Sequence, residues 1–324
     1  MSVETRGKWT DLIPDTGLKI TEVVDQGDSL YTPGIFNILM TGSFGDKAQK
    51  NISGKTGFGE AKEFEDGQNV PELSRYKTYT TKIEARNYGG SVDISKNQIE
   101  DRDFESELSE MKDLSRSINL SVDKSGVQLL NGGFATTRQV NGYTLTWYND
   151  GNPQFSTVHA TVVPGGSTQS NASSTGIKLG HDNLETGRIA LNLQQTDNGD
   201  PLALSGNVQL VVPLNLGKEA RETVNSPLTP ETSNNAINVY RGEVTVISTP
   251  FLDASNGGSN TAWFLMDPTE HELHQETRQE KRLEMDKNIK NKVVTFTVDA
   301  RWANFSKDWR GTWASKGDLA AYSS

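Results

Sequence analysis

Two histidines three positions apart come closest to a metal-binding pattern in this sequence. His271, Glu272 and His274 spell HELH, whereas the HExxH zinc motif places its histidines four positions apart on a helix. Histidines at i and i+3 would still share a helix face, and Glu276 or Glu280 could add a carboxylate ligand. The alternative is a solvated helix with many charges, which we favour. A metal-dependent hydrolase centred on the two histidines remains an alternative function.

A third histidine stands close to residue types that hydrolases use. His159 ends the segment DGNPQFSTVH, which also contains Asp150 and Ser156. The chain has no G-x-S-x-G nucleophile elbow, the turn that exposes a catalytic serine in one large hydrolase class. We therefore expect His159 to be a loop histidine that makes structural hydrogen bonds.

Two further motifs are incomplete. Gly54–Thr56 spells the end of a phosphate-binding loop, but Gln49 occupies the position of the required first glycine. The acidic residues of Asp101–Glu105 alternate as in a calcium loop, but Ser106 stands where the turn glycine is needed. These acids suit the positive end of a helix dipole instead. We predict no catalytic, cofactor-binding or metal-ligating residue, and we expect that the protein is not an enzyme.

The composition excludes several kinds of protein. The chain has 324 residues, no cysteine and a net charge of −10, with a pI near 5.0 and a mean hydropathy of −0.60. Disulfides and thiolate metal sites are therefore excluded. The acidic balance disfavours a protein that reads DNA sequence, but it suits a container wall over which DNA slides. The first residues lack a secretory pattern, and no run of 18 apolar residues predicts a membrane span.

The hydrophobic pattern predicts an α+β protein with an unusual order of parts. We expect an irregular arm over residues 1–53, a long two-stranded ribbon with arms near 58–66 and 75–86, and a rod-like helix over 98–130. A mixed module follows, with helices at 181–197 and 218–224 and strands at 208–216, 243–251 and 262–268. A strand over 290–305 closes the chain. An isolated ribbon is only marginally stable in water, so this one predicts a neighbouring subunit.

Individual side chains support these elements. In the rod-like helix, one mostly apolar face is predicted to contain Leu108, Met111, Ser115, Ile118 and Val122. In the last strand, alternation places Val294, Phe296, Val298, Ala300 and Trp302 on one face. Trp309 and Trp313 are expected to anchor the C-terminal end to the core.

Several segments in this order resemble those of the major capsid proteins of tailed bacteriophages, which have the Hong Kong 97 fold, and most closely the Mu-like major head subunit family. FEDGQNVPE (64–72) followed by YKTYTTKIEARNYGGSVDISKNQIEDRDF (76–104) is similar to that family's extended loop and the start of its spine helix. LLNGGF (129–134), DGNPQFSTVH (150–159) and RIALNLQQTDNGDPLALSGNVQLVVPLNL (188–216) continue the likeness. WFLMDP (263–268) and DARWANFSKDWRGTWAS (299–315) complete it.

The resemblance implies a division into an N-terminal arm (1–53), an extended loop (54–94), a peripheral domain with the spine helix (95–176), an axial domain (177–262) and a return to the peripheral domain with a tail (263–324). It implies a structural protein that self-assembles through hexamers and pentamers into an icosahedral head enclosing double-stranded DNA, without a cofactor or a membrane. Other implied partners are a portal, a separate scaffolding protein and a decoration protein. The implied location is the virion, after assembly in the bacterial cytoplasm.

Two expectations concern the limits of this resemblance. The sequence begins at Met1, so we expect no proteolytic removal of a fused scaffolding segment. A nanocompartment shell of the same fold, holding an enzyme cargo instead of DNA, is an alternative function.

Overall fold

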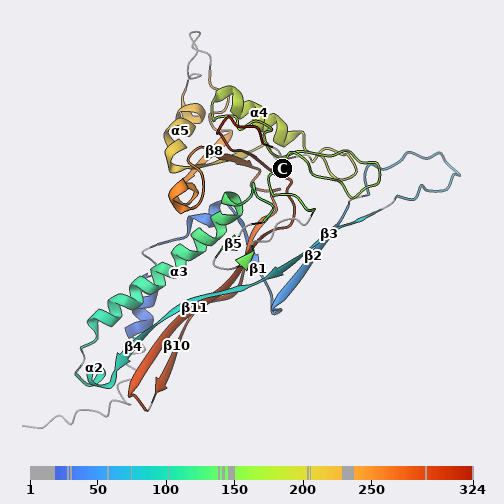
Figure 1. The fold of residues 1–324 in the computed structure, drawn as a ribbon. Coiled ribbons are helices and arrows are strands. Elements are labelled where there is room, and N and C mark those ends of the chain that lie inside the picture. The colour runs from blue at the N-terminus through green and yellow to red at the C-terminus, as the bar shows by residue number, and fades with distance from the viewer. Residues whose placement is uncertain are drawn as a thin grey trace, which may run out of the picture.

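The protein has an elongated lower part, a more compact upper part and a ribbon that projects from their junction (Figure 1). The computed structural model describes residues 19–322, apart from residues 28, 30, 57, 74, 102, 138, 141–142, 145–149, 203, 205, 228–236 and 289. Among the described residues, no helix is both long enough and apolar enough to cross a membrane. Residues 1–18 of the predicted arm lie outside the described residues.

A four-stranded sheet runs the length of the lower part, in the order β1-β10-β11-β4. Its strands are β1 (Met40–Ser43), β4 (Arg86–Ser95), β10 (Leu273–Asn288) and β11 (Val293–Ser306). β1 runs parallel to β10, and the other two pairs are antiparallel. The predicted alternation in β11 is confirmed, because all five residues expected on one face are buried: Val294, Phe296, Val298, Ala300 and Trp302.

The long helix that packs on this sheet is interrupted near its start. The sequence predicted one helix over 98–130, but the structure has α2 (Lys96–Asp101) followed by α3 (Glu105–Asn131). Phe104 separates them with φ −138°, and its side chain is buried in the core beneath the helices. Burial of this aromatic ring favours a kink over helix continuity. The predicted apolar face is confirmed by the burial of Met111, Ser115 and Ile118.

The arm is more regular than predicted. Residues 19–27 are helical, and a 3₁₀ turn, η1 (Gly34–Asn37), precedes β1. Ile20 and Val24 are buried in the same core as α3 and β11, whereas Ile35 belongs to a second core at the other end of α3. The glycines and prolines of this segment had suggested irregular chain, but packing on α3 stabilises short elements that the local sequence alone does not.

The ribbon is also built differently from the prediction. Its paired strands are β2 (Gln49–Lys55) and β3 (Lys77–Glu84), so the predicted strand over 58–66 is wrong. The 58–66 segment is rich in glutamate and lysine, which are depleted in strands, and it lies beyond the paired part. β2 crosses the predicted arm–loop boundary at residues 53 and 54; the domain division itself stays a prediction.

The upper part contains a second four-stranded sheet with two helices on one face. Its order is β12-β9-β7-β8, with strands β7 (Val208–Pro213), β8 (Val244–Thr249), β9 (Trp263–Met266) and β12 (Thr312–Ser315). The helices are α4 (His181–Asn192) and α5 (Gly217–Asn225). Leu210 and Val212 pack with the helices, whereas Val211 faces the core shared with α3. Both predicted tryptophan anchors, Trp309 and Trp313, are buried.

Short elements complete the chain and correct several predicted boundaries. They are β5 (Gln139–Val140), β6 (Tyr143–Thr144), η2 (Leu214–Leu216), η3 (Pro250–Leu252) and η4 (Ala254–Asn256). The strand predicted over 208–216 ends at Pro213, and the strand predicted over 243–251 ends at Thr249. The helix predicted over 181–197 ends at Asn192.

Candidate functional site

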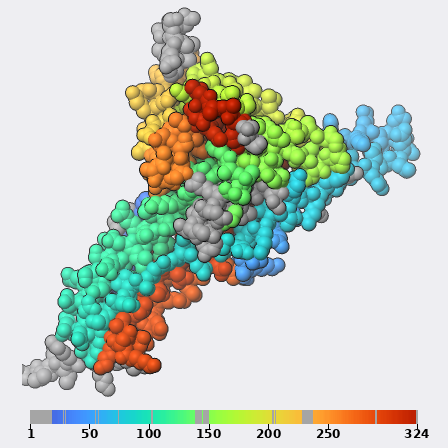
Figure 2. Space-filling view, viewed as in Figure 1, coloured from blue at the N-terminus to red at the C-terminus, as the bar shows by residue number. Residues whose placement is uncertain are grey.

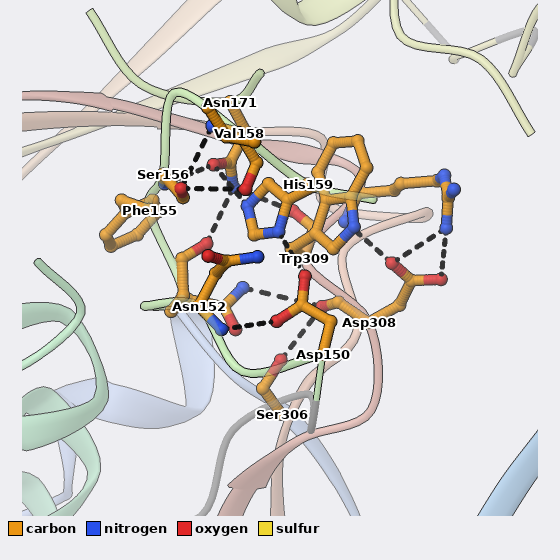
Figure 3. Close-up of polar contacts among 12 residues, drawn as sticks. Asp150, Asn152, Phe155, Ser156, Val158, His159, Asn171, Ser306, Asp308 and Trp309 are labelled. Carbon is orange, nitrogen blue, oxygen red and sulfur yellow. Dashed lines mark hydrogen bonds and ion pairs between the residues drawn. The ribbon is translucent and has the colours of Figure 1, made fainter. Parts of the chain in front are cut away.

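The candidate catalytic histidine lies in a buried polar cluster between loop 150–171 and the chain before β12 (Figure 3). His159 Nδ1 lies 2.6 Å from Asp150 Oδ2, and His159 Nε2 lies 3.0 Å from Asn171 Oδ1. The imidazole is stacked on Trp309, with ring centroids 4.3 Å apart. The side chains of His159 and Asp150 are each 1% exposed. The cluster therefore joins two segments far apart in sequence inside the protein.

The hydrogen bonds of Asn171 show which ring nitrogen of His159 carries a hydrogen. Its Nδ2 donates to the carbonyls of Gln154 at 2.8 Å and Trp309 at 3.2 Å, and its Oδ1 accepts from the amide of Ser156 at 2.9 Å. This orientation requires that His159 Nε2 carry the hydrogen in its contact with Asn171. The other ring nitrogen, Nδ1, faces the carboxylate of Asp150, so both ring nitrogens have polar partners.

This arrangement differs from a Ser–His–Asp triad. The hydroxyl of Ser156 donates to the carbonyl of Val158 at 3.0 Å, and both nitrogens of His159 already have other partners. A triad needs a histidine nitrogen within hydrogen-bond reach of the serine oxygen. The geometry supports the predicted structural role of His159.

An arginine extends the same cluster toward the upper part. Arg310 pairs with Asp197 at 2.9 Å and with Asp308 at 3.0 Å, and its guanidinium lies 4.6 Å from the ring centroid of Trp309. Burial raises the pKa of Asp308, although Arg310 opposes this shift. Arg310 also donates to the carbonyl of Gln195 at 2.7 Å. Sequence reasoning missed Arg310 because nothing local distinguishes it from a surface arginine.

The predicted helix around the other histidine pair is wrong, because this segment enters the central strand β10. His274 lies within β10 and His271 just before it. His274 Nε2 is 2.6 Å from Glu272 Oε2, and His271 Nδ1 accepts from the amide of Leu273 at 3.3 Å. Burial, together with the nearby His274, lowers the pKa of His271 to about 4. Among the described residues, no group of three histidine or acidic side chains could hold a metal ion.

The two incomplete motifs also lie in structural positions. Gly54 is in β2, and the buried Thr56 accepts a hydrogen bond from the amide of Tyr76 at 2.9 Å, which extends the ribbon by one step. Asp101 ends α2, and Glu105 begins α3. The acidic residues therefore lie at and between the ends of two helices, and they do not surround a common position for a calcium ion.

A buried acid joins the arm to α3. Asp123 is 3% exposed. Its carboxylate accepts from the amides of Ile35 at 2.8 Å and Gly34 at 3.1 Å and from the hydroxyl of Tyr31. Sequence reasoning missed Asp123, but a signal existed: it lies eight residues after Ser115, on the buried side of the helix. A charged residue there predicts a buried partner.

The tip of the ribbon presents apolar side chains to solvent. Phe58, Phe64 and Val70 are 53%, 49% and 70% exposed. Figures 1 and 2 show this segment extending well beyond the compact part of the protein. Its base is fixed by a small core that includes Phe44, Ile83 and Phe305. The ribbon is thus anchored at one end, and its other end carries three exposed apolar side chains among charged residues.

Comparisons with known proteins agree with this arrangement. A family model described as phage capsid protein matches residues 78–315. A search of curated protein sequences finds no significant match. Among solved structures, the mature capsid of bacteriophage PhiM1 has a TM-score of 0.55 at 10% identity, covering 88% of this chain and 87% of that one. The bacteriophage JBD30 capsid has a TM-score of 0.53 at 16% identity, covering 69% and 92%.

A third solved structure, the capsid of an empty GTA particle, has a TM-score of 0.52 at 10% identity and covers 91% of both chains. Identities this low show the fold alone, and the predicted α+β fold of the Hong Kong 97 type is confirmed. The assignment to the Mu-like branch stays a prediction. Because the family model covers well over half of the sequence, the chain belongs to the phage capsid protein family, and its function is to form the capsid shell.

Proposed function

We propose that this chain assembles through rings of five and six copies into an icosahedral phage head that encloses double-stranded DNA. The observation that carries the proposal is the ribbon, which leaves the body of its own chain and presents Phe58, Phe64 and Val70 to solvent. An isolated two-stranded ribbon gains little stability by itself, so a neighbouring copy is the natural surface for these side chains. The protein acts by assembly and not by catalysis.

The other parts of the chain have different roles in assembly. In the predicted division, residues 95–176 with 263–324 form the peripheral domain on α3, and residues 177–262 form the axial domain that meets its neighbours around the ring axes. β9 and β12 cross this division, because they complete the sheet of β7 and β8. Within the arm, residues 1–53, and the extended loop, residues 54–94, the parts outside β1 and β4 reach adjacent copies. Heterologous contacts of this kind close into rings when the rotation between copies permits.

The charge of the chain fits a container for DNA. The net charge is −10, so the shell as a whole repels packaged DNA and does not hold it through phosphate contacts. Portal, scaffolding and decoration proteins are the further partners of such a head, and the finished protein is located in the virion after assembly in the host cytoplasm.

A loop deletion tests the proposal. Removing residues 59–73 and joining the ends with a short Gly-Ser linker leaves β2, β3 and β4 intact, whereas a deletion through residue 86 would also remove β3. We expect a folded protein with native circular dichroism that forms no closed particles in electron micrographs. Closed shells from the deletion variant would contradict the proposed role of the ribbon.

A matched pair of substitutions separates the apolar tip from general surface effects. Phe64→Ser with Val70→Ser should reduce particle yield strongly, because it removes the apolar contact but keeps the chain length. Val158→Ser changes an apolar side chain of similar exposure, 47%, outside the ribbon and serves as the control. Equal particle yields from both variants would remove support for an apolar docking contact.

A further inference from the structure

We propose that α4 of one copy docks on residues 237–241 of the next copy, through matched apolar and charged positions, and that this contact closes the ring. The inference rests on the proposed ring assembly and assigns the surfaces that meet within it. Each copy carries both surfaces, so the contact is heterologous, and every subunit uses one surface toward each neighbour.

The first surface is the outer stripe of α4. Leu184, Gly187 and Leu191 form the buried face of this helix against the upper sheet. On the opposite side, Ile189 and Leu193 are 49% and 71% exposed. Residues at three- and four-residue steps share a helix face, so these two positions continue the line that begins at Asp182, whose side chain is fully exposed. The stripe therefore has an acidic end and an apolar end.

The second surface is a short segment, residues 237–241, that enters a turn at Val239 and has alternating exposure. Asn238 and Tyr240 point inward and are 3% and 2% exposed, whereas Ile237 and Val239 are 79% and 60% exposed. Arg241 is the next exposed position. This surface therefore has an apolar end and a basic end.

Inward hydrogen bonds hold the second surface in place. Asn238 Nδ2 donates to the carbonyls of Thr223 and Val224 at the end of α5, at 2.8 and 3.2 Å. The Tyr240 hydroxyl donates to Glu185 on α4 at 2.9 Å. The exposed side chains are thus presented by a segment fixed between two helices, and a fixed surface loses little conformational entropy on docking.

The two surfaces do not meet within one copy. The side of α4 that faces the segment carries Glu185 and Arg188, which bond to Tyr240 and to Glu243. Ile189 lies one turn after Glu185, about 40° around the helix, and Leu193 lies farther round. Ile189, Leu193, Ile237 and Val239 are nevertheless all at least 49% exposed, so the two surfaces do not cover each other within one copy, and a second copy can supply the partner.

The two surfaces carry complementary kinds of side chain. Each has two exposed apolar positions, Ile189 and Leu193 on the helix side and Ile237 and Val239 on the segment. Each also has one exposed charged residue, Asp182 on α4 and Arg241 after Val239, and these two charges are opposite. We assign Leu193 to Ile237 in the docked pair, so that an apolar contact and an ion pair form between the same two surfaces.

Engineered cysteines test this pairing directly, because the natural chain has none. Leu193→Cys combined with Ile237→Cys should give, after mild oxidation of assembled protein, a ladder of disulfide-linked chains that ends at five and six copies. Leu193→Cys alone should stay monomeric in denaturing gels. Disulfide-linked dimers from that single variant would mean that α4 meets α4, which overturns the heterologous pairing.

The control pairs Leu193→Cys with Asn291→Cys, at the far end of the lower part, and should give no ladder. Electron micrographs of the same samples show whether particles form, independently of whether a disulfide ladder appears. Particles without a ladder from the 193–237 pair would overturn this inference and leave the proposed function standing. If neither the natural chain nor the variant forms rings or shells and no ladder appears, both the inferred pairing and the proposed assembly are contradicted.

A mixing experiment provides a second, independent test. Ile189→Lys with Leu193→Lys blocks one surface, and Ile237→Lys with Val239→Lys blocks the other. All four side chains are exposed, so both variants should fold, as circular dichroism would check. Each variant alone should sediment as a monomer, and an equimolar mixture should sediment with twofold mass, because one intact pair of surfaces remains. Rings formed by either variant alone would overturn the inference.

Discussion

The buried carboxylate of Asp123 on α3 accepts a hydrogen bond of 2.8 Å from the backbone amide of Ile35 in the arm. The same carboxylate accepts from the amide of Gly34 at 3.1 Å and from the hydroxyl of Tyr31. Burial and the bond to Asp123 raise the pKa of Tyr31, which keeps this hydroxyl protonated as a donor. One side chain therefore fixes the course of the arm along the spine helix.

Asp123→Ala should loosen the arm. Two backbone amides would lose their acceptor in a buried place, and each unsatisfied group costs about 1–3 kcal/mol. We expect a fall in the free energy of unfolding of a few kcal/mol in urea and faster proteolytic cleavage near residue 31. Asp113→Ala is the control, because Asp113 is an exposed acid on the same helix. Equal effects of the two substitutions would contradict the role of Asp123.

His159→Ala should destabilise the protein strongly. Removing the imidazole takes away the histidine partner of the buried Asp150 Oδ2 and one partner of Asn171 Oδ1, and a buried polar group left unsatisfied costs about 1–3 kcal/mol, more if it is charged. Asp150→Asn should cost less, because a neutral histidine can accept from the new amide at Nδ1 and still donate to Asn171. Urea unfolding of both variants measures the difference. A His159→Ala protein as stable as the natural chain would show that the cluster does not hold the two segments together.

Acidification should weaken the fold through His271. The pKa of its imidazole is about 4 in the folded protein and 6.5 in its ordinary state. Between these values the unfolded chain binds more protons, so the free energy of unfolding falls as pH drops through this window and levels off below about 4. The shift corresponds to about 3 kcal/mol. His271→Gln should flatten this part of the pH profile, measured by urea titration at several pH values; an unchanged slope would contradict the assignment.

Close packing of α4 gives a further test. A Cβ on Gly187 would lie 2.8 Å from Leu265 Cδ1 and 2.8 Å from the ring of Trp313. Gly187→Ala should therefore lower the thermal midpoint, although alanine is the better helix former. Ala190→Gly on the same helix is the comparison, since Ala190 is only partly buried against the same core and the change loses mainly helix propensity. A higher midpoint for Gly187→Ala would show that the helix can move away from the sheet without cost.

The sequence predicts the elements whose burial follows a simple period. The alternating face of β11 and the apolar face of α3 were found because each element buries one side only. Trp309 and Trp313 were placed correctly because large aromatic side chains near a chain end gain most from burial. The capsid fold was predicted because these parts, in this order, resemble those of a known family.

Prediction from the sequence failed where contacts between distant segments override the local secondary-structure preference. β10 contains Leu273–Asn288, a segment rich in residues that favour helices, but it pairs with β1 on one side and β11 on the other. The helix break at Phe104 and the strand β2 depend on packing between distant segments. The cluster of His159, Asn171 and Arg310 joins three separate parts of the chain, and sequence spacing does not reveal such contacts.

Cryo-electron microscopy of particles assembled from the natural chain, expressed with its neighbouring genes, shows where each ribbon lies in the shell. We expect closed icosahedral shells in which the tip of each ribbon, with Phe64 and Val70, lies against an adjacent copy. Preparations that contain only monomers, or shells whose ribbon tips remain in solvent, would contradict this expectation.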